Sequence, residues 1–201
     1  MAATLLSYKK LYGADLGPYL RDLARLRMEI FREFPYLYEG SLAYEQDYLQ
    51  TYLKCSEALI ALAFYGDLLV GATTCLPFES ETSEVRAPFE RAGIDLKRAV
   101  YFGESILKSD FRGRGVGNAF FDMREAHAKD LFPNLSMTGF CAVCRPEIHP
   151  RKPASYRPLD EFWVKRGYSK QEHLVAAFSW KDIDDPKETL KPLVFWTKNW
   201  G

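Results

Sequence analysis

Residues 112–117 read Arg112-Gly113-Arg114-Gly115-Val116-Gly117, a turn-forming segment with three glycines and two arginines. The residues before it, 100–108, form an apolar, β-compatible run, whereas residues 116–127 carry apolar side chains at helical spacing. We therefore predict that the segment connects a strand to a helix. Unpaired backbone N–H groups and the positive end of the helix dipole converge at such a turn, which favours an anion. The glycines allow close backbone approach, and the arginines add charge that suits phosphate.

Spacing separates three phosphate-binding patterns that could use this turn. A P-loop requires Lys followed by Ser or Thr at the start of the helix, where this chain has Asn118 and Ala119. A Rossmann turn requires a third glycine three residues after the second, and Asn118 or Phe120 would have to serve as that glycine. The sequence therefore argues against both a P-loop and a dinucleotide-binding turn.

The rest of the chain predicts one α/β domain over residues 1–201, because no Pro/Gly/Ser-rich or highly charged stretch offers an internal linker. The predicted elements are a helix from Asp15 to Pro35, a helix over 41–54, a hairpin of strands 57–65 and 68–76, a charged surface insertion over 79–99, a strand over 100–108, the helix after the turn, a strand over 135–144, a short helix over 159–166, and strands over 168–181 and 193–200.

Composition limits the class of function. Twenty-seven basic and 27 acidic residues cancel, so we expect neither a nucleic-acid nor a membrane partner. No apolar run approaches the roughly 20 residues that span a bilayer, and we expect a cytoplasmic protein. The four cysteines are too few for a disulfide framework and are interpreted as small core residues. Cys141 and Cys144 are three apart on a predicted strand and face opposite sides, so no metal site is predicted.

The turn resembles a known signature. Arg112, Gly115 and Gly117 match the pattern Gln or Arg, two residues, Gly, one residue, Gly or Ala that marks the GNAT (N-acetyltransferase) superfamily. Residues 159–168, with an aromatic pair followed by glycine and tyrosine, look like the family's second motif, and the first helix looks like its opening helix. The resemblance covers most of the chain and is thin over residues 79–99 and 145–157.

The resemblance implies a single mixed, largely antiparallel twisted sheet of about seven strands flanked by helices. It also implies transfer of an acetyl group from acetyl-CoA to an amine of a small molecule or peptide, by direct attack of the amine on the thioester. A homodimer is compatible with it. Backbone groups of the turn and helix start would hold the CoA pyrophosphate: Arg112, Gly113, Arg114, Gly115, Val116, Gly117 and Asn118.

Residues of the preceding strand would act closer to the thioester. By resemblance, the backbone of Leu107 would pair with the pantetheine arm, and the N–H of Ser105 would polarise the thioester carbonyl. Glu104 lies beside them and is the first candidate for the base that removes a proton from the amine. The alternative interpretation of Glu104 is an exposed or paired strand carboxylate.

The general acid that protonates the leaving thiolate is less clear from the sequence. Many relatives have Tyr in the second motif's aromatic pair, whereas this chain has Phe162-Trp163, and Trp cannot usefully donate a proton. Tyr156, Tyr168, Cys144 or water could substitute. Tyr156 is favoured because it stands seven residues before Trp163, and Tyr168 is expected in the core. The missing Tyr also leaves open a CoA-binding module with weak or no turnover.

Two further groups of residues are candidates for acceptor binding. Four basic residues of the Pro-rich loop could bind a carboxylate of the acceptor or the CoA 3′-phosphate, unless they are only solvated: Arg145, Arg151, Lys152 and Arg157. Three tyrosines between the first two helices could line an acceptor pocket, unless they pack in the core: Tyr36, Tyr38 and Tyr44. His149 is the one histidine that merits a functional test.

Overall fold

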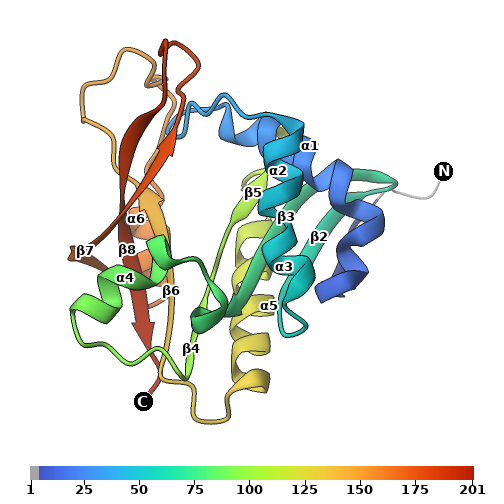
Figure 1. The fold of residues 1–201 in the computed structure, drawn as a ribbon. Helices are drawn as coiled ribbons and strands as arrows, with labels where there is room; N and C mark the ends of the chain where they lie inside the picture. The colour runs from blue at the N-terminus through green and yellow to red at the C-terminus, as the bar shows by residue number, and fades with distance from the viewer. Residues whose placement is uncertain (1–4) are drawn as a thin grey trace.

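The computed structural model describes residues 5–201 and shows a twisted sheet with helices on both faces (Figure 1). Its strands are β1 (Leu6–Tyr12), β2 (Leu59–Tyr65), β3 (Leu68–Pro77), β4 (Ala99–Tyr101), β5 (Ser105–Leu107), β6 (Met137–Val143), β7 (Ser169–Trp180) and β8 (Thr189–Asn199). Its helices are α1 (Leu20–Phe31), α2 (Leu42–Tyr48), α3 (Gln50–Lys54), α4 (Ser83–Arg91), α5 (Val116–Leu131) and α6 (Asp160–Lys165). Short 3-10 helices span Gly13–Tyr19, Phe78–Ser80 and Ser109–Phe111.

The sheet has eight strands in the order β1-β2-β3-β4-β6-β8-β7, and β5 pairs with β3. Strands β4 and β6 run parallel, and the other pairs are antiparallel. The predicted α/β fold with a mixed, largely antiparallel sheet is confirmed, with eight strands instead of about seven. The sequence missed β1, an edge strand with mostly exposed side chains, because its residues lack the alternating apolar pattern that predicts a strand.

The strand predicted over residues 100–108 is interrupted at residues 102–104, and this break separates β4 from β5. Tyr101 and Ile106 are five residues apart but belong to the same core cluster, whereas regular alternation would place them on opposite faces. The backbone therefore contains an extra residue, as in a β-bulge. Glycine is needed at Gly103, because a Cβ there would collide with the hydroxyl of Tyr52.

The first two predicted helices differ in detail from the structure. Residues Gly13–Tyr19 form a 3-10 helix that contains Pro18, so α1 begins only at Leu20 and Asp15 is not its N-cap. The helix predicted over 41–54 is divided at Leu49 into α2 and α3. Ser41 does cap α2, since its Oγ accepts a hydrogen bond of 3.3 Å from the backbone N–H of Tyr44.

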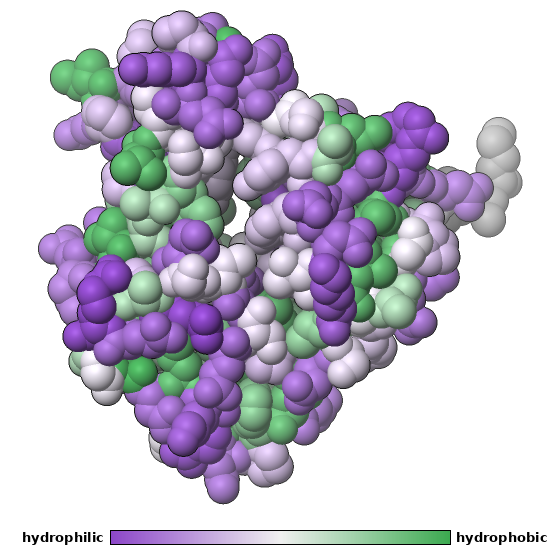
Figure 2. All heavy atoms as spheres, viewed as in Figure 1, coloured by the Kyte–Doolittle hydropathy of each residue, from purple (hydrophilic) through white to green (hydrophobic). Residues whose placement is uncertain are grey.

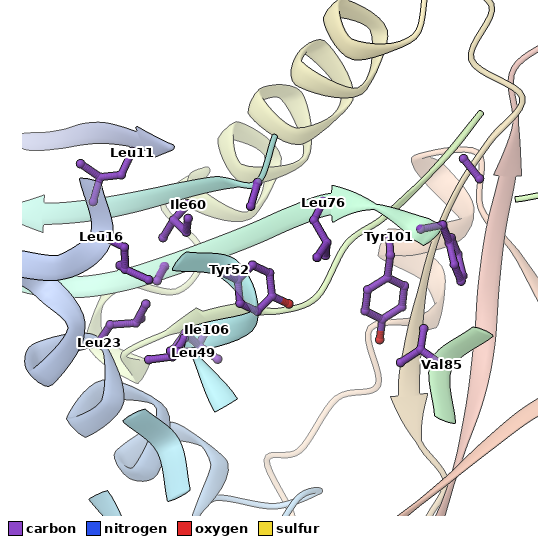
Figure 3. Packing of buried hydrophobic residues seen from close by; sticks show 14 of the residues in the cluster. Leu11, Leu16, Leu23, Leu49, Tyr52, Ile60, Leu76, Val85, Tyr101 and Ile106 are labelled. Atoms are coloured by element: carbon purple, nitrogen blue, oxygen red, sulfur yellow. The ribbon is translucent and has the colours of Figure 1, made fainter. Parts of the chain in front are cut away.

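One large core cluster lies between the sheet and helices α1 to α3 (Figure 3). Leu23 from α1 and Leu49 beside α3 meet Ile60 and Ile106 from the strands there. A second cluster lies between the sheet and α5 and α6 and is rich in aromatic rings. Ile106 of β5 and Met137 of β6 lie in the large cluster, Phe140 of β6 lies in the second, and Leu107 of β5 packs against a third, smaller cluster around Val116 and Phe120.

The predicted surface insertion over residues 79–99 is only partly a surface feature. Val85 and Phe89 of α4 are buried in the large core cluster, and the Phe89 ring lies 4.7 Å from those of Phe78 and Phe195. Gly93 follows α4 with a φ of +69°, as expected of a residue that ends a helix. The insertion is therefore a packed element of the domain and not a free lid.

The four cysteines are free thiols with different surroundings. Cys75 is buried, as predicted, but Cys144 is exposed and Cys55 and Cys141 are half-buried. The interpretation of all four as core residues was therefore wrong for Cys144. None of the helices within residues 5–201 is long and apolar enough to cross a membrane.

Candidate active site

The sheet opens into a wedge between β5 and β6. The last backbone hydrogen bond between the two sides runs from Phe102 N–H to the Gly139 carbonyl, at 2.8 Å. Beyond it, β5 remains paired with β3 and β6 with β8, so their facing edges separate. Ser105 is exposed and residues 141–143 are half-buried, although both strands lie in the interior of the sheet. Figure 2 shows the surface hollowed between the two halves of the molecule. We call this space the wedge.

The backbone of β5 presents hydrogen-bond donors to the wedge. Glu104 accepts from Thr74 N–H, and Lys108 donates to the Val70 carbonyl, so residues 104, 106 and 108 direct their backbone groups toward β3. In an antiparallel pair the intervening residues direct theirs the opposite way. The N–H groups of Ser105 and Leu107 therefore face the wedge. The Leu107 carbonyl is occupied by Arg112, whose Nε donates to it at 3.2 Å.

The glycine turn leads from the end of β5 to the start of α5. Gly113 and Gly115 have φ values of +75° and +83°, and Gly115 is the N-cap of α5. The first N–H groups of the helix, on Val116 to Asn118, have no partner within the helix. No described atom lies within 4 Å of a Cβ built on Gly113 or Gly115, so the space there is open. Open space, free N–H groups and a helix N-terminus together fit a phosphate group.

The two arginines of the turn lie on the surface. Arg112 bonds to the carboxylate of Glu33 at 2.7 Å as well as to the Leu107 carbonyl. The guanidinium of Arg114 lies 5.3 Å from the centre of the Phe111 ring. A Cβ on Gly117 would meet the Phe162 ring at 3.5 Å, an ordinary contact, so helix α6 packs directly over the start of α5.

Glu104 lies in a buried ionic network. Its carboxylate pairs with Nη1 of Arg27 from α1, and Nε of Arg27 pairs with Glu45 from α2 at 2.5 Å. Burial disfavours the charge of Arg27, but the adjacent Glu45 outweighs burial, and the pKa of Arg27 is raised. The Arg27 guanidinium also lies 4.3 Å from the centre of the Tyr48 ring. Glu104 is thus a paired carboxylate in the break between β4 and β5, and the sequence offered no signal for its pairing with Arg27.

A second buried carboxyl group, Glu81, lies on the same side of the sheet. The Tyr52 hydroxyl bonds to it at 3.4 Å, and the backbone N–H of Thr82 at 3.1 Å. Burial raises the pKa of Glu81. Tyr48 is 3.5 Å from the Tyr52 hydroxyl, and Tyr101 is 3.1 Å from the Cys141 thiol. The sequence analysis missed Glu81 because it lies in the insertion, 29 residues after its partner Tyr52.

The candidates for the general acid lie in three different environments. Tyr156 is half-buried in the loop after β6, with its ring 4.7 Å from that of Phe34, and burial raises its pKa. Tyr168 is buried and its hydroxyl bonds to Thr138 at 2.8 Å, which confirms the prediction of a core position. Trp163 also packs in this core, against Phe140 and Trp196. Cys144 is exposed.

The end of the wedge opposite β4 is bridged by the chain that follows α1 (Figure 1). Arg145, just after β6, donates to the backbone carbonyls of Pro35 and Tyr36 and pairs with Asp182 at 2.7 Å. The backbone of Tyr38 forms a β-bridge with Asp182. The wedge is thus bounded by the β4–β6 pairing at one end and by this bridge at the other.

The other residues proposed for acceptor binding are also engaged within the protein. Arg151 pairs with Asp184, Lys152 bonds to the Glu147 carbonyl, and Arg157 bonds to the carbonyls of Ala154 and Tyr156. Tyr36 stacks on Trp180 near the bridge, whereas Tyr44 is 57% exposed. His149 packs on Phe34. Within residues 5–201 no three His, Cys, Asp or Glu side chains are grouped as metal ligands.

No protein-family model matches the sequence, and no curated protein matches it. Solved structures match over nearly the whole chain. A Desulfovibrio desulfuricans protein assigned to the GNAT family of acetyltransferases is 10% identical, with 97% of this chain and 99% of that chain covered and a TM-score of 0.57. Ribosomal-protein-alanine N-acetyltransferase from Brucella melitensis is 12% identical, with 96% and 99% covered and a TM-score of 0.59.

A third similar structure was solved with coenzyme A. It is the PaiA N-acetyltransferase from Thermoplasma acidophilum, which is 12% identical, with 98% of this chain and 99% of that chain covered and a TM-score of 0.51. At such identities the comparison reports the fold. The chain therefore has the fold of the GNAT acetyltransferases.

Proposed function

We propose that the protein is an acetyl-CoA-dependent N-acetyltransferase that acylates an amine of a small molecule or peptide. The observation that carries the proposal is the continuity of two donor sets along one path. The N–H groups of Ser105 and Leu107 face the wedge, and the glycine turn and the N-terminus of α5 follow within ten residues. A long ligand with an acyl group at one end and phosphates at the other matches that path.

The chain's own residues would hold the cofactor mainly through backbone. The N–H groups from Arg112 to Asn118 would bind the pyrophosphate, and the N–H of Leu107 would bind the pantetheine arm. The N–H of Ser105 would donate to the thioester oxygen as negative charge develops there. When bound, acetyl-CoA supplies an activated acetyl group. The side chain of Arg112 has to release the Leu107 carbonyl if the pantetheine arm uses that group as well.

The amine has to lose a proton before it attacks, and Glu104 is our candidate for the group that accepts it. Arg27 holds the Glu104 carboxylate in an ion pair, and this pair has to weaken when the carboxylate accepts a proton. We therefore expect the rate enhancement from Glu104 to lie at the lower end of the range for general-base catalysis. Tyr156 is the candidate for the acid that protonates the thiolate.

A second candidate function is a CoA-binding module without turnover. The observation that favours it is the packing of the half-buried Trp163 against Phe140 and Trp196, which places no proton donor at the position where relatives carry Tyr. The same structure would then bind CoA through the turn but release no thiol.

We also propose a cytoplasmic location without nucleic-acid or membrane partners. The zero net charge supports the absence of such partners. A homodimer is the assembly that we propose to test by light scattering.

Thiol release and ligand binding together test the proposal. Purified protein should release CoA thiol from acetyl-CoA in the presence of at least one member of a panel of amines. CoA should raise the melting temperature, because a ligand that binds only the native state stabilises it by mass action. NAD and ATP should not. Stabilisation by CoA without thiol release would favour the binding module, and equal stabilisation by ATP would contradict both functions.

A further inference from the structure

Arg124, in the middle of α5, is an arginine buried without a carboxylate partner among the described residues. Its side chain is 2% exposed and lies between two aromatic rings, with the guanidinium 4.3 Å from the centre of Phe102 and 4.5 Å from that of Phe121. Its Nε and Nη2 have no hydrogen-bond partner in the described structure. Burial lowers the pKa of Arg124 to about 10, so the group stays charged at neutral pH. A buried cation without an ionic partner is costly.

Among the described residues, Arg124 forms one hydrogen bond, and its acceptor is a backbone carbonyl. Its Nη1 donates to the carbonyl oxygen of Glu104 at 3.5 Å. The same oxygen accepts from the Thr73 hydroxyl at 2.7 Å and from the Thr74 N–H at 3.1 Å. Three donors, one of them a cation, therefore converge on a single carbonyl oxygen.

That carbonyl and the N–H of Ser105 belong to the same peptide unit. The peptide group is delocalised, so donors on its oxygen draw electron density away from its nitrogen. Hydrogen bonds in such a chain strengthen one another, by about 10–30% per bond. The oxygen faces β3 and α5, whereas the N–H faces the wedge. Charge placed on one side of the peptide therefore strengthens the donor on the other side.

We infer that Arg124 is a positioning residue that, with Thr73, polarises the Glu104–Ser105 peptide and makes the Ser105 N–H a stronger donor toward the wedge. The catalytic consequence rests on the proposed function, in which this N–H binds the oxygen that gains negative charge during acyl transfer. The polarisation itself is a property of the ligand-free protein. It also accounts for a charge in a place where packing alone would favour an apolar side chain.

A purely structural role for Arg124 and a polarising role predict different effects of substitution on the Ser105 amide. Replacing a buried, ionically unpaired charge by an apolar side chain of similar length is often neutral or stabilising. Arg124→Met should therefore fold with a melting temperature equal to or above that of the wild type. Under our proposal the variant nevertheless loses the polarisation of the Ser105 N–H. The melting temperature and the polarisation of the Ser105 N–H then change independently.

The test is the amide proton shift of Ser105 in ¹H–¹⁵N spectra of the ligand-free protein. Arg124→Met and Thr73→Val should both move it upfield, because each removes a donor from the Glu104 carbonyl. Arg166→Met is the matched control: Arg166 also lies over Phe121, at 5.3 Å, but it pairs with Asp122 and Glu125. It should leave the Ser105 shift in place. If Arg124→Met fails to fold, Thr73→Val and Arg124→Lys, which keeps the cation, take its place.

Kinetics on the same variants connect the polarisation to the reaction. Arg124→Met should lower kcat roughly tenfold without raising KM for acetyl-CoA, less than the ~10²–10³-fold lost when an oxyanion donor is removed outright. An unmoved Ser105 shift in Arg124→Met or Thr73→Val would overturn the inference, and a moved shift with unchanged kcat would overturn its catalytic consequence. Absence of thiol release in the wild type would refute the proposed function, and the amide shift would still decide whether Arg124 polarises this peptide.

Discussion

Glu104 and Glu81 are two buried carboxyl groups in opposite surroundings. Glu104 faces the guanidinium of Arg27, whereas Glu81 faces a tyrosine hydroxyl and a backbone N–H. A cationic neighbour stabilises the ionised carboxylate, and burial among neutral groups stabilises the protonated acid. The two side chains thus serve different chemistry although they lie on the same side of the sheet.

Glu104→Gln should lower the acylation rate chiefly at lower pH, where most of the amine is protonated and a base matters most. We expect a loss of about 10²-fold, the lower end for general-base catalysis, because the carboxylate has to give up part of its ion pair with Arg27 when it accepts a proton. Rates of thiol release measured across pH check this. A rate within about twofold of the wild type at every pH would remove Glu104 from the mechanism.

Glu81→Gln should change the pH dependence of stability. The folded-state pKa of Glu81 is raised by burial above its ordinary value of 4.5, so its favourable contribution is complete below that value and is lost as pH rises through the folded-state pKa. The unfolding free energy of the wild type should therefore fall relative to that of the variant as pH rises, by at most about 1.4 kcal/mol per pH unit. Urea denaturation at several pH values measures this difference.

The neighbours of Glu81 do not interfere with this measurement. Burial raises the pKa of Tyr48 and Cys141 to about 12 and raises that of Tyr101 well above its ordinary value, so these groups stay neutral over the pH range used. Tyr52 also stays neutral, since burial raises its pKa well above the ordinary value. Glu90→Gln, at an exposed position on α4, is the matched control. A parallel pH dependence in wild type and Glu81→Gln would contradict the prediction.

Tyr156→Phe should lower turnover by roughly 10²-fold while CoA affinity stays nearly unchanged, because a proton donated to the thiolate matters mainly in the transition state. The packing of the ring on Phe34 is retained in the variant, so its stability should hold. Tyr12→Phe, at an exposed tyrosine of β1, serves as the control. Should the catalytic constant of Tyr156→Phe be normal, Cys144 or water would remain as the acid, since Tyr168 bonds to Thr138 in the core.

At the scale of elements, β5, the glycine turn and α5 work as one unit. β5 fixes which N–H groups face the wedge, and the left-handed glycines turn the chain so that α5 begins with its free N–H groups beside that edge. The unit depends on backbone conformation more than on side-chain identity. The effect of a substitution in this unit should therefore depend on the φ angle at that position and on the space around its Cβ.

Gly115→Asp should weaken CoA binding far more than it destabilises the protein. Its φ of +83° makes any side chain cost about 1–2 kcal/mol, and a carboxylate near the pyrophosphate adds repulsion of roughly 1–4 kcal/mol, or about tenfold or more in affinity. Gly93→Asp is the matched control, since Gly93 has a φ of +69° and equally open space but follows α4. Calorimetric titration with CoA would show the turn to be a mere connector if both variants bound equally.

At the scale of the whole molecule, the wedge separates two half-sheets that are held at both ends. Strands β1, β2, β3 and β5 form one half and β6, β8 and β7 the other, joined by the short β4–β6 pairing. The other end is held by Arg145, which contacts the segment after α1 and also Asp182. The width of the wedge thus depends on contacts far from the proposed chemistry.

Arg145→Met should destabilise the protein by about 3 kcal/mol, because it leaves Asp182 and two carbonyls without their largely buried partner. It should also weaken CoA binding, since the two halves of the wedge are then joined less firmly. Arg151→Met is the control, because its pair with Asp184 is exposed and worth less than about 1 kcal/mol. Denaturation and CoA titration of both variants measure the two effects, and equal stability of the two variants would contradict the role of Arg145.

The sequence by itself determined the strand-turn-helix unit and most of the element order. Glycine and arginine at residues 112–117 encode a local conformation, and local conformation is readable from neighbouring residues. The hairpin at residues 59–77 follows for the same reason. Strand β1 was missed because an exposed edge strand has no apolar period to read.

Only the tertiary structure decided which charged and polar groups meet around the site. Arg27 meets Glu104 across 77 positions of sequence, and Tyr52 meets Glu81 across 29, because separate helices and loops converge on the bulge at residues 102–104. Burial is likewise a property of the packed molecule. Only the packed molecule shows that Arg145 connects the two halves of the sheet, that Tyr168 lies in the core and that Arg124 is a buried cation. Electrostatic interactions depend on distance in space and on exclusion of water, and neither is written in residue spacing.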